Sequence, residues 1–338
     1  MARNPFNLTR NGQTSESRLS VTVFLTIALF FLLTLSGCGP REAENQKLII
    51  ADQFGLAYAP LEIMKSMDFL EKELLERNAG SVEVEWKRMG NTAAIREAML
   101  AGDLDIGFAA IPPFLIGKES GMDWRIISGL SESPVALITS DSSLSSISDL
   151  TKDHRIILPQ PGSIQHILLS MLAEKELGDA RAFDDRLLAM SHPDGVTALV
   201  SGKGKELHFT APPYMQEELA QDGFRILADG EDAFGGPFTF IVGICPERVY
   251  ERKEVYAAFK AALTSSILYM EENPKESIAI LMEAYSYDEE SLKGYLAEEQ
   301  MRYTTEVRGI ETFASFMSRS GFLKTEPAMD ELYWEEGK

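Results

Sequence analysis

A hydroxyl and an imidazole stand three residues apart in the stretch PQPGSIQH, residues 159–166. Ser163 and His166 could serve as the nucleophile and the general base of a hydrolase. The strained G-x-S-x-G turn that usually presents such a serine is missing, and the local sequence places no Asp or Glu to orient the imidazole. A Ser-His hydrolase is therefore the weakest of the interpretations that this stretch allows.

The residues that follow suggest a structural role for Ser163. An apolar stripe predicts an amphipathic helix that begins after Ser163 and ends before Gly178. Ser163 is then the N-cap residue, whose hydroxyl accepts a backbone N–H of the first turn. This cap requires no ligand. His166 lies opposite the stripe, so we expect its side chain either at the surface or in a cleft.

The turn before this helix also suits a ligand. It joins the apolar strand RIIL (155–158) to the helix through Gly162. Such a turn presents free N–H groups and a partial positive charge to the crevice at the strand ends. An oxyanion or a carbonyl oxygen is the expected ligand atom. The turn is not a Walker-type phosphate loop, because the spaced glycines and the Lys-Ser/Thr pair are missing.

Residues 89–128 and 190–228 repeat one order of features: polar turn, helix, glycine, short strand, Pro-Pro-aromatic, second helix and second strand. The repeat predicts two similar α/β lobes with largely parallel sheets. In each Pro-Pro-aromatic triplet, proline fixes the turn at a strand end. Phe114 and Tyr214 could hold an apolar face of a ligand between the lobes, or each could pack under its own helix.

Other turns at strand ends supply further candidates. In the MGNT turn of the first repeat, Asn91 or Thr92 can cap the next helix. His208 could reach the pocket from its floor, whereas His154 and His192 look like loop residues. The complete set of candidate ligand-binding residues is Gln53, Phe54, Gly55, Gly90, Asn91, Thr92, Ile111, Pro112, Phe114, Gly162, Ser163, Gln165, His166, Thr210, Pro212 and Tyr214.

Composition narrows the classes of function. The net charge of −20 over 338 residues argues against nucleic acid and anionic membrane surfaces as partners. The sequence contains no H-E-x-x-H, C-x-x-C or EF-hand motif, so we expect neither a metal nor a cofactor. Cys245 is the only cysteine besides Cys38, which leaves no intrachain disulfide framework once Cys38 is modified.

The first 37 residues have the pattern of a signal peptide, with a basic start and an apolar run from Val21 to Leu33 that is short for a bilayer span. The LSGC ending (35–38) resembles a bacterial lipobox, in which Cys38 becomes the lipidated first residue after cleavage. Residues 38–46 would then form a tether. The alternative is an uncleaved membrane anchor, and in both cases the rest of the chain lies outside the cytoplasm.

Four segments carry a family resemblance: LIIADQFGLAYAPLEIMKSMDFLEKE, GNTAAIREAMLAGDLDIGFA, PGSIQHILLSMLAEKELG and GIETFASFMSRSGFL. Behind a lipobox, they resemble the substrate-binding components of ABC importers of the nitrate, sulfonate and taurine class, which has relatives that bind thiamine pyrimidine precursors. In sulfonate-binding relatives a Gly-Ser-x-x-His stretch helps to hold the anionic head, and Gly162, Ser163 and His166 match it. The chain departs from the family at ELHFTAPP, where an Asp-Ala pair is common, and at Asp68, where glycine is usual.

The resemblance implies an α/β fold of the type II periplasmic binding-protein kind, with two doubly wound α/β lobes joined by two crossover strands. The apolar runs 134–139 and 237–245 are the expected crossovers. Lobe 1 would comprise residues 47–133 and 238–338, and lobe 2 would comprise residues 134–237.

The implied protein is not an enzyme. It would be a lipid-anchored monomer that captures a small organic or anionic solute, such as a sulfonate, nitrate, taurine or a pyrimidine, by closure of the lobes. It would then present the solute to a permease that is driven by a separate ATPase subunit. A lipoprotein that senses the solute and signals to a membrane partner remains an alternative.

Overall fold

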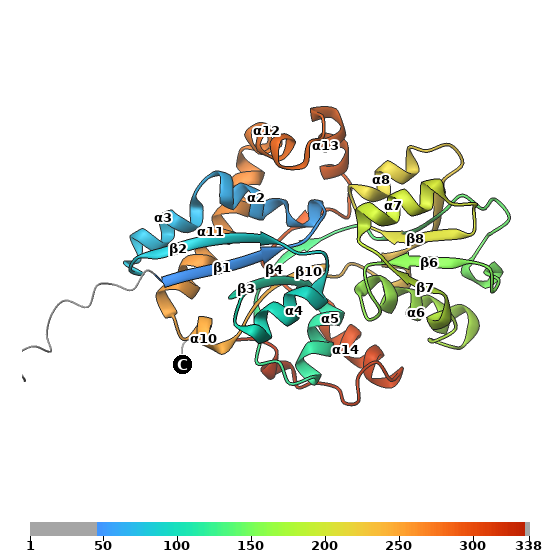
Figure 1. Cartoon of the computed structure of the whole chain (residues 1–338), viewed down its shortest axis with the longest axis horizontal. Coiled ribbons are helices and arrows are strands. Elements are labelled where there is room, and N and C mark those ends of the chain that lie inside the picture. Colours follow the sequence, from blue (N-terminus) through green and yellow to red (C-terminus); the bar gives the residue numbers. More distant parts are fainter. Residues whose placement is uncertain (1–45, 335–338) are drawn as a thin grey trace, which may run out of the picture. The chain divides into compact units, whose positions relative to one another are not determined.

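The computed structural model describes residues 46–334, which form two β-sheets flanked by helices (Figure 1). Cys38, the predicted signal peptide and all of the predicted tether except Gln46 lie outside the described residues. Across sheet A the strand order is β11 (Arg302–Tyr303), β4 (Arg125–Glu132), β10 (Ile241–Cys245), β3 (Ile106–Ala110), β1 (Gln46–Asp52) and β2 (Val82–Arg88). Across sheet B it is β7 (Leu187–Ala189), β6 (Arg155–Leu158), β8 (Glu206–Thr210), β5 (Ala136–Thr139) and β9 (Arg225–Asp229).

The two sheets share one topology. In sheet A, β1 runs parallel to β2 and β3, and β10 is inserted antiparallel between β3 and β4. In sheet B, β6 runs parallel to β7 and β8, and β5 pairs antiparallel with β8 and β9. Strands β5 and β10 come from the two apolar runs that the sequence indicates as crossovers. The expected pair of doubly wound α/β lobes joined by two crossovers is confirmed.

The sequence repeat corresponds to matching elements. The first copy contains α4 (Thr92–Ala101), β3, α5 (Ile111–Glu119) and the start of β4. The second contains α7 (His192–Ser201), β8, α8 (Tyr214–Leu219) and β9. The predicted lobe boundaries, after residues 133 and 237, fall between β4 and β5 and between α9 (Gly230–Phe234) and β10.

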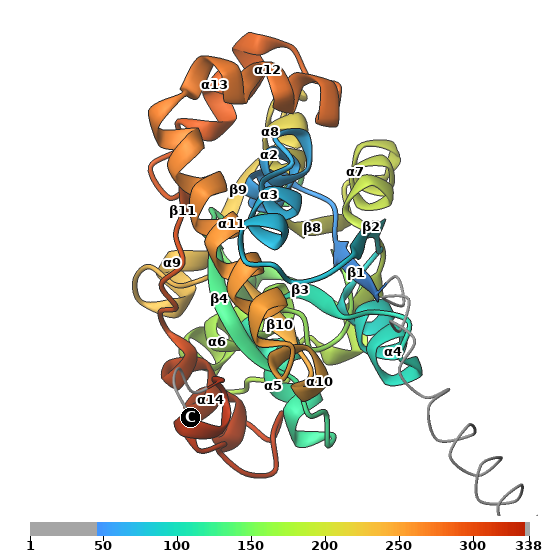
Figure 2. The ribbon, with the colours of Figure 1, turned by 90° about the vertical axis from the view of Figure 1, so that its left-hand side faces the viewer.

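The remaining helices cover the sheets. Helix α11 (Lys253–Glu272) packs against α2 (Ala59–Ser66) and α3 (Phe69–Glu76), as Figure 2 shows. These two helices are separate because Asp68 adopts a left-handed conformation with φ of 52°. The other helices are α6 (Ile164–Leu177), α10 (Glu247–Tyr250), α12 (Pro274–Tyr285), α13 (Glu289–Leu296) and α14 (Ile310–Arg319), with 3₁₀ turns η1 (Leu56–Tyr58), η2 (Ile147–Asp149), η3 (Asp184–Arg186) and η4 (Met329–Glu331).

Strand position explains the sequence patterns. Strand β3 (IGFAA) is buried throughout and has a neighbouring strand at each edge, which agrees with its lack of polar residues. Strand β2 (VEVEWKR) lies at the edge of sheet A, and its alternation of apolar and charged residues gives it one solvated face. Within residues 46–334, no helix is long and apolar enough to span a bilayer.

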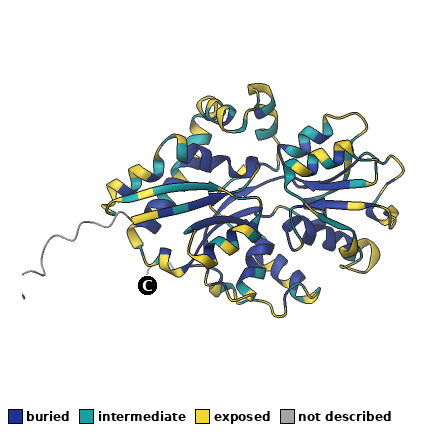
Figure 3. Cartoon of the chain, viewed as in Figure 1, coloured by how far each residue is buried: buried dark blue, intermediate teal, exposed yellow. Residues whose placement is uncertain are grey.

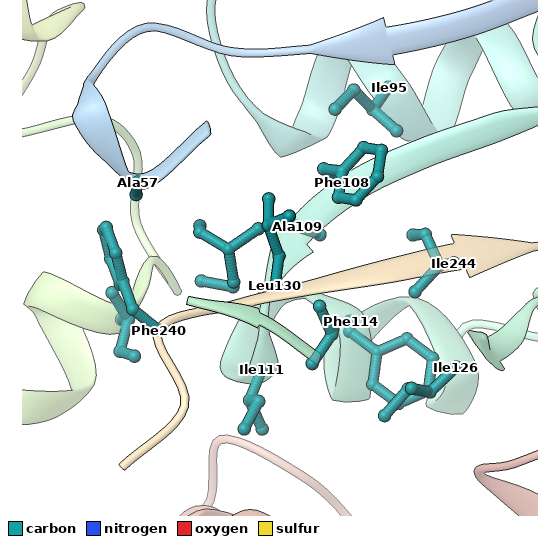
Figure 4. Close-up of a cluster of buried hydrophobic side chains, with 14 of the residues drawn as sticks. Ala57, Ile95, Phe108, Ala109, Ile111, Phe114, Ile126, Leu130, Phe240 and Ile244 are labelled. Atoms are coloured by element: carbon teal, nitrogen blue, oxygen red, sulfur yellow. The ribbon is translucent and has the colours of Figure 1, made fainter. Parts of the chain in front are cut away.

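The core lies between the sheets and their helices, where Figure 3 shows the buried residues. Figure 4 shows Phe108 of β3, Ile244 of β10 and Phe114 of α5 within one apolar cluster. The ring centroid of Phe114 lies 6.1 Å from that of Trp124, and both side chains are fully buried. Gly117 allows this packing, because a Cβ at that position would lie 1.9 Å from the Trp124 ring.

Candidate functional site

A pocket lies where both sheets present the carboxyl ends of their parallel strands. Its walls come from turns after β1, β2 and β3 in sheet A and after β6, β7 and β8 in sheet B. This is the edge at which open α/β sheets bind ligands. The cavity has a volume of only about 50 Å³, far below the usual range for a ligand pocket. The two walls are therefore close together in this structure.

Nine of the predicted ligand-binding residues line this pocket. They are Gln53, Phe54, Gly55, Gly90 and Thr92 on the sheet A side, and Ser163, Gln165, Pro212 and Tyr214 on the sheet B side. The structure therefore brings together residues that are up to 161 positions apart, from Gln53 to Tyr214.

On the sheet A side, hydrogen bonds orient the polar groups. The Gln53 amide donates to Thr92 Oγ1 at 3.2 Å and to the Phe108 carbonyl at 2.8 Å. Asn91, which does not line the pocket, is the N-cap of α4, since its Oδ1 accepts the Ala94 N–H at 3.0 Å. The sequence prediction of a cap at Asn91 or Thr92 is thus resolved in favour of Asn91.

On the sheet B side, Ser163 is the N-cap of α6, as expected. Its Oγ accepts the His166 backbone N–H at 3.3 Å. Gly162 precedes it with φ of 78°, a conformation that glycine adopts without strain. The first turn of α6, with Ile164 and Gln165 in the lining, faces the pocket with the positive end of the helix dipole.

Two hydrogen bonds join the walls directly. Gln160, before α6, accepts the Ala93 N–H of α4 through Oε1 at 3.1 Å. The Leu56 N–H donates to the Pro212 carbonyl at 3.1 Å. The amide oxygen of Gln160 therefore occupies the N-terminus of α4, where an oxygen of a ligand could also bind.

His166 corrects the expectation of a surface or cleft position. Its side chain is buried and does not line the pocket. Nδ1 accepts the Gly162 N–H at 2.9 Å, and Nε2 lies 2.9 Å from Asp184 Oδ1. The ring packs edge-on against Phe322, with centroids 5.2 Å apart. Burial lowers the pKa of His166, although Asp184 opposes this effect. Asp184, which no local pattern indicated, orients the imidazole.

Other predicted residues lie outside the pocket lining. Phe114 belongs to the core beside Trp124, so the suggested Phe114–Tyr214 clamp is absent and the alternative of packing under its own helix holds. Tyr214 instead stacks on His192, with centroids 5.7 Å apart and an interplanar angle of 19°. Ile111, Pro112, Gly162 and Thr210 also lie outside the lining, although their neighbours Ala110, Pro113, Ser163 and Ala211 belong to it.

His192 is the main residue that sequence reasoning missed. It begins α7, after the Ser191 cap, and it lines the pocket rather than lying in a loop. Its Nδ1 lies 3.0 Å from His208 Nε2, and His208 Nδ1 is hydrogen-bonded to Glu218 Oε1. His208 is fully buried and therefore does not reach the pocket itself. Burial lowers the pKa of His208 to about 3 and raises the pKa of Glu218 to about 9.

A neutralised cluster of charges stands beside the pocket on sheet A. Asp52, fully buried at the end of β1, lies 2.7 Å from Lys65 Nζ and 3.1 Å from Arg88 Nη2. Glu62 also contacts both cations. Two acids and two bases cancel, so the cluster adds no net charge near the ligand. In the described part of the chain, no group of His, Cys, Asp and Glu side chains could hold a metal ion.

Comparison with solved structures identifies the fold. No family model and no curated protein matches the sequence. The alkanesulfonate-binding protein SsuA from Xanthomonas axonopodis pv. citri, bound to MOPS, is similar in structure, with a TM-score of 0.71, 19% identity, and coverage of 86% of this chain and 99% of that chain. The aliphatic sulphonate binding protein SsuA from Escherichia coli matches with a TM-score of 0.66, 19% identity, and coverage of 87% and 94%.

A third solved structure comes from a fungus. The Candida albicans CA3427 gene product, described as having the generic periplasmic binding protein structural fold, matches with a TM-score of 0.65, 14% identity, and coverage of 85% of this chain and 93% of that chain. The strand order, the two inserted antiparallel strands and these likenesses agree. The chain has the periplasmic binding protein fold.

Proposed function

We propose that this protein is the solute-binding component of an ABC importer. It captures a small organic or anionic solute in the pocket between the sheets and delivers it to a permease that is driven by a separate ATPase subunit. It acts outside the cytoplasm as a monomer, held at the membrane by a lipid on Cys38. It forms and breaks no covalent bond in the solute.

The observation that carries this proposal is a pocket with walls from both sheets. Residues 47–133 and 238–338 would move as one lobe, and residues 134–237 as the other. A solute shifts an open–closed equilibrium only if it binds the closed state better, and contacts to both walls provide that difference. Gln53 on one wall and Gln165 on the other both line the pocket, which supports such contacts.

The lining suits a small polar solute. Among the described residues, none of those lining the pocket is Lys, Arg, Asp or Glu. Its polar groups are amides, hydroxyls, His192 and the first-turn N–H groups of α6, while Tyr214 and Phe240 add aromatic surface. Neutral donors and a helix N-terminus can hold an oxyanion or a carbonyl group without a full counter-charge. Sulfonate, nitrate and taurine offer such oxygen acceptors, and a pyrimidine offers ring nitrogens that accept hydrogen bonds in the same way.

The geometry disfavours the hydrolase alternative. Both ring nitrogens of His166 are engaged, one by the Gly162 N–H and one by Asp184. Ser163 Oγ is used as an acceptor by the backbone of α6. A general base must have a free nitrogen within hydrogen-bond distance of the nucleophile. His166 lacks one here.

Thermal unfolding tests the proposal. We expect at least one member of a panel of sulfonates, nitrate, taurine, carboxylates and pyrimidines to raise the melting temperature, because binding at 100 times Kd adds about 2.7 kcal/mol of stability. Tyr214→Ala should reduce this shift, because it removes the aromatic contact in the pocket. Tyr295→Ala, on α13 and outside the pocket lining, is the matched control and should leave the shift unchanged.

Two results would contradict the proposal. One is a melting temperature that no member of the panel changes. The other is consumption of a bound compound, followed by mass spectrometry, which would identify an enzyme. An intact compound recovered from the protein after a thermal shift supports solute binding.

A further inference from the structure

A line of hydrogen-bonded side chains leads from the pocket into the interior of the sheet B half. Gln165 Nε2 lies 3.3 Å from His192 Nε2, and His192 Nδ1 lies 3.0 Å from His208 Nε2. His208 Nδ1 is hydrogen-bonded to Glu218 Oε1. Gln165 and His192 line the pocket, whereas His208 and Glu218 have no exposed surface. We refer to these four residues as the Glu218 chain.

The rings in this chain are held by close packing. Helix α7 approaches β8 at Gly195, where an added Cβ would lie 2.6 Å from His208 Cε1. Tyr214 stacks on His192. Turning either ring away would break its contact with a neighbouring ring. The pattern of donors and acceptors along the chain is therefore coupled from end to end.

Each ring is neutral, because burial lowers the pKa of both His192 and His208. A neutral imidazole has one N–H donor and one bare acceptor nitrogen. In this structure the Gln165 amide nitrogen faces His192 Nε2. If Glu218 carries a proton, it donates to His208 Nδ1, and His208 Nε2–H donates to His192 Nδ1. The Gln165 amide then turns by 180°, so that His192 Nε2–H donates to the Gln165 carbonyl oxygen. The Gln165 NH₂ group then remains for the pocket.

If Glu218 is ionised, every bond in the chain reverses. Both rings carry their proton on Nδ1, and the Gln165 NH₂ donates to His192 Nε2. The Gln165 oxygen then remains for the pocket. The change between the two states balances: the Glu218 proton passes to His208 Nδ1, the His208 Nε2 proton passes to His192 Nδ1, and the His192 Nε2 proton leaves to solvent.

We propose that Glu218 is a positioning residue that decides, through His208 and His192, whether Gln165 turns a hydrogen-bond donor or an acceptor toward the solute. This inference rests on the proposed solute-binding function. With Glu218 protonated, the pocket selects solutes that offer an oxygen acceptor, such as sulfonates, carboxylates and carbonyl compounds. It rejects solutes that offer only N–H donors at that position.

Two observations favour the protonated state. Glu218 Oε2 is buried and has no hydrogen-bond partner among the described residues, which would leave a charged carboxylate half unsatisfied. Burial raises the pKa of Glu218 to about 9, and the charge of neighbouring Glu217 acts in the same direction. The Glu218 chain should therefore turn the Gln165 NH₂ group toward the pocket at neutral pH and the Gln165 oxygen toward it above about pH 9.

The other titratable groups near the chain do not produce this reversal. Glu217 points to Tyr287, whose hydroxyl donates to it. Burial raises the pKa of Tyr214 to about 12, with Arg88 of sheet A acting slightly in the opposite direction. Among the four residues of the Glu218 chain, only Glu218 is expected to ionise between about pH 7 and pH 10.

The test measures the ring tautomers in the solute-free protein by long-range ¹H–¹⁵N spectra of ¹⁵N-histidine-labelled samples. We expect His192 and His208 to carry their proton on Nε2 at pH 7 and on Nδ1 at pH 10. Glu218→Gln should abolish this reversal. His166 is an internal control, because its Nδ1 accepts the Gly162 N–H and its tautomer should stay the same.

The proposal is overturned if either ring carries its proton on Nδ1 at pH 7, is an imidazolium, or shows no reversal by about pH 10.5. The wild-type measurement alone decides these points, even if Glu218→Gln does not fold. The solute preference is tested with acceptor-only probes (acetate, methanesulfonate) and donor-only probes (methylammonium, guanidinium). At pH 7 the acceptor-only probes should raise the melting temperature, and a shift with the donor-only probes alone would overturn the proposal.

The two proposals fail in distinguishable ways. If the tautomers reverse as expected and no solute of any class binds, the proposed transport function fails and the polarity of the Glu218 chain stands. If acceptor solutes bind and the tautomers do not reverse, solute binding stands and the role of Glu218 is refuted.

Discussion

At the residue scale, side chains next to one another in sequence have different roles. Ser163 caps α6, Gln165 lines the pocket, and His166 is buried behind the turn with Asp184. Successive helical positions differ by about 100° around the helix axis, so Gln165 and His166 face different surroundings. The spacing of Ser163 and His166 therefore puts both at the start of one helix, but it does not bring both into contact with one ligand.

The first prediction at this scale concerns stability and pH. Burial raises the pKa of Glu218 to about 9 in the folded protein, whereas a glutamate carboxyl in the unfolded chain has its ordinary pKa of 4.5. Folding therefore takes up a proton between these values, and stability falls as pH rises through this window. Glu218→Gln should lose less stability than wild type between pH 5 and pH 9, by at least about 1.4 kcal/mol.

Urea unfolding at several pH values measures this difference. Glu97→Gln, which changes an exposed carboxylate on α4, is the matched control and should show no such trend. Equal pH dependence in wild type and Glu218→Gln would contradict the raised pKa and the protonated state of the Glu218 chain.

At the element scale, turns at strand ends bring the two walls together. Gly55 has φ of 119°, and a Cβ there would lie 3.3 Å from the Pro212 carbonyl, which accepts the Leu56 N–H. Gln160 reaches from the turn before α6 to the first turn of α4. Both contacts join elements of different sheets, so the proposed opening of the lobes would break both.

Gln160→Ala tests the contribution of one such contact. It removes the hydrogen bond to the Ala93 N–H, which is worth about 1 kcal/mol. We expect the ratio of open to closed molecules without solute to rise about fivefold. Small-angle X-ray scattering should then give a larger radius of gyration for the variant than for wild type.

Gln221→Ala, which lies exposed beyond α8, is the control for this experiment and should scatter like wild type. A saturating solute should remove the difference between Gln160→Ala and wild type. Identical solute-free scattering from the two proteins would show that Gln160 does not hold the walls together.

At the scale of the whole molecule, the predicted lipid anchor at Cys38 would hold the protein at the membrane, although its net charge of −20 gives it no attraction to an anionic membrane surface. Cys38→Ser should release the protein from the membrane fraction, because a lipidated N-terminal cysteine would be its only attachment after cleavage. Cell fractionation followed by immunoblotting measures this. Cys245→Ser, at a buried cysteine, is the control and should remain with the membrane.

If Cys38→Ser remains in the membrane fraction in the same amount as wild type, the protein has an uncleaved membrane anchor and is not a lipoprotein. The mass of the purified protein gives an independent check, since cleavage before Cys38 removes 37 residues.

The sequence alone predicted the architecture because the architecture depends on periodicity. Buried strands such as β3 read as continuous apolar runs, and caps such as Ser163 and Asn91 stand directly before their helices. The repeat of helix, strand and Pro-Pro-aromatic indicated two similar lobes. These are local or regularly spaced signals, and each is determined by contacts within one element or one sheet.

The tertiary structure alone decided which side chains meet. The burial of Phe114 against Trp124, the pairing of His166 with Asp184, and the line from His192 to Glu218 all join separate elements. Such contacts depend on how α5, α6, α7 and α8 pack, which leaves no regular spacing in the sequence. A residue at the start of a helix, such as His192, therefore looks like an ordinary loop position in the sequence until the fold places it in the pocket.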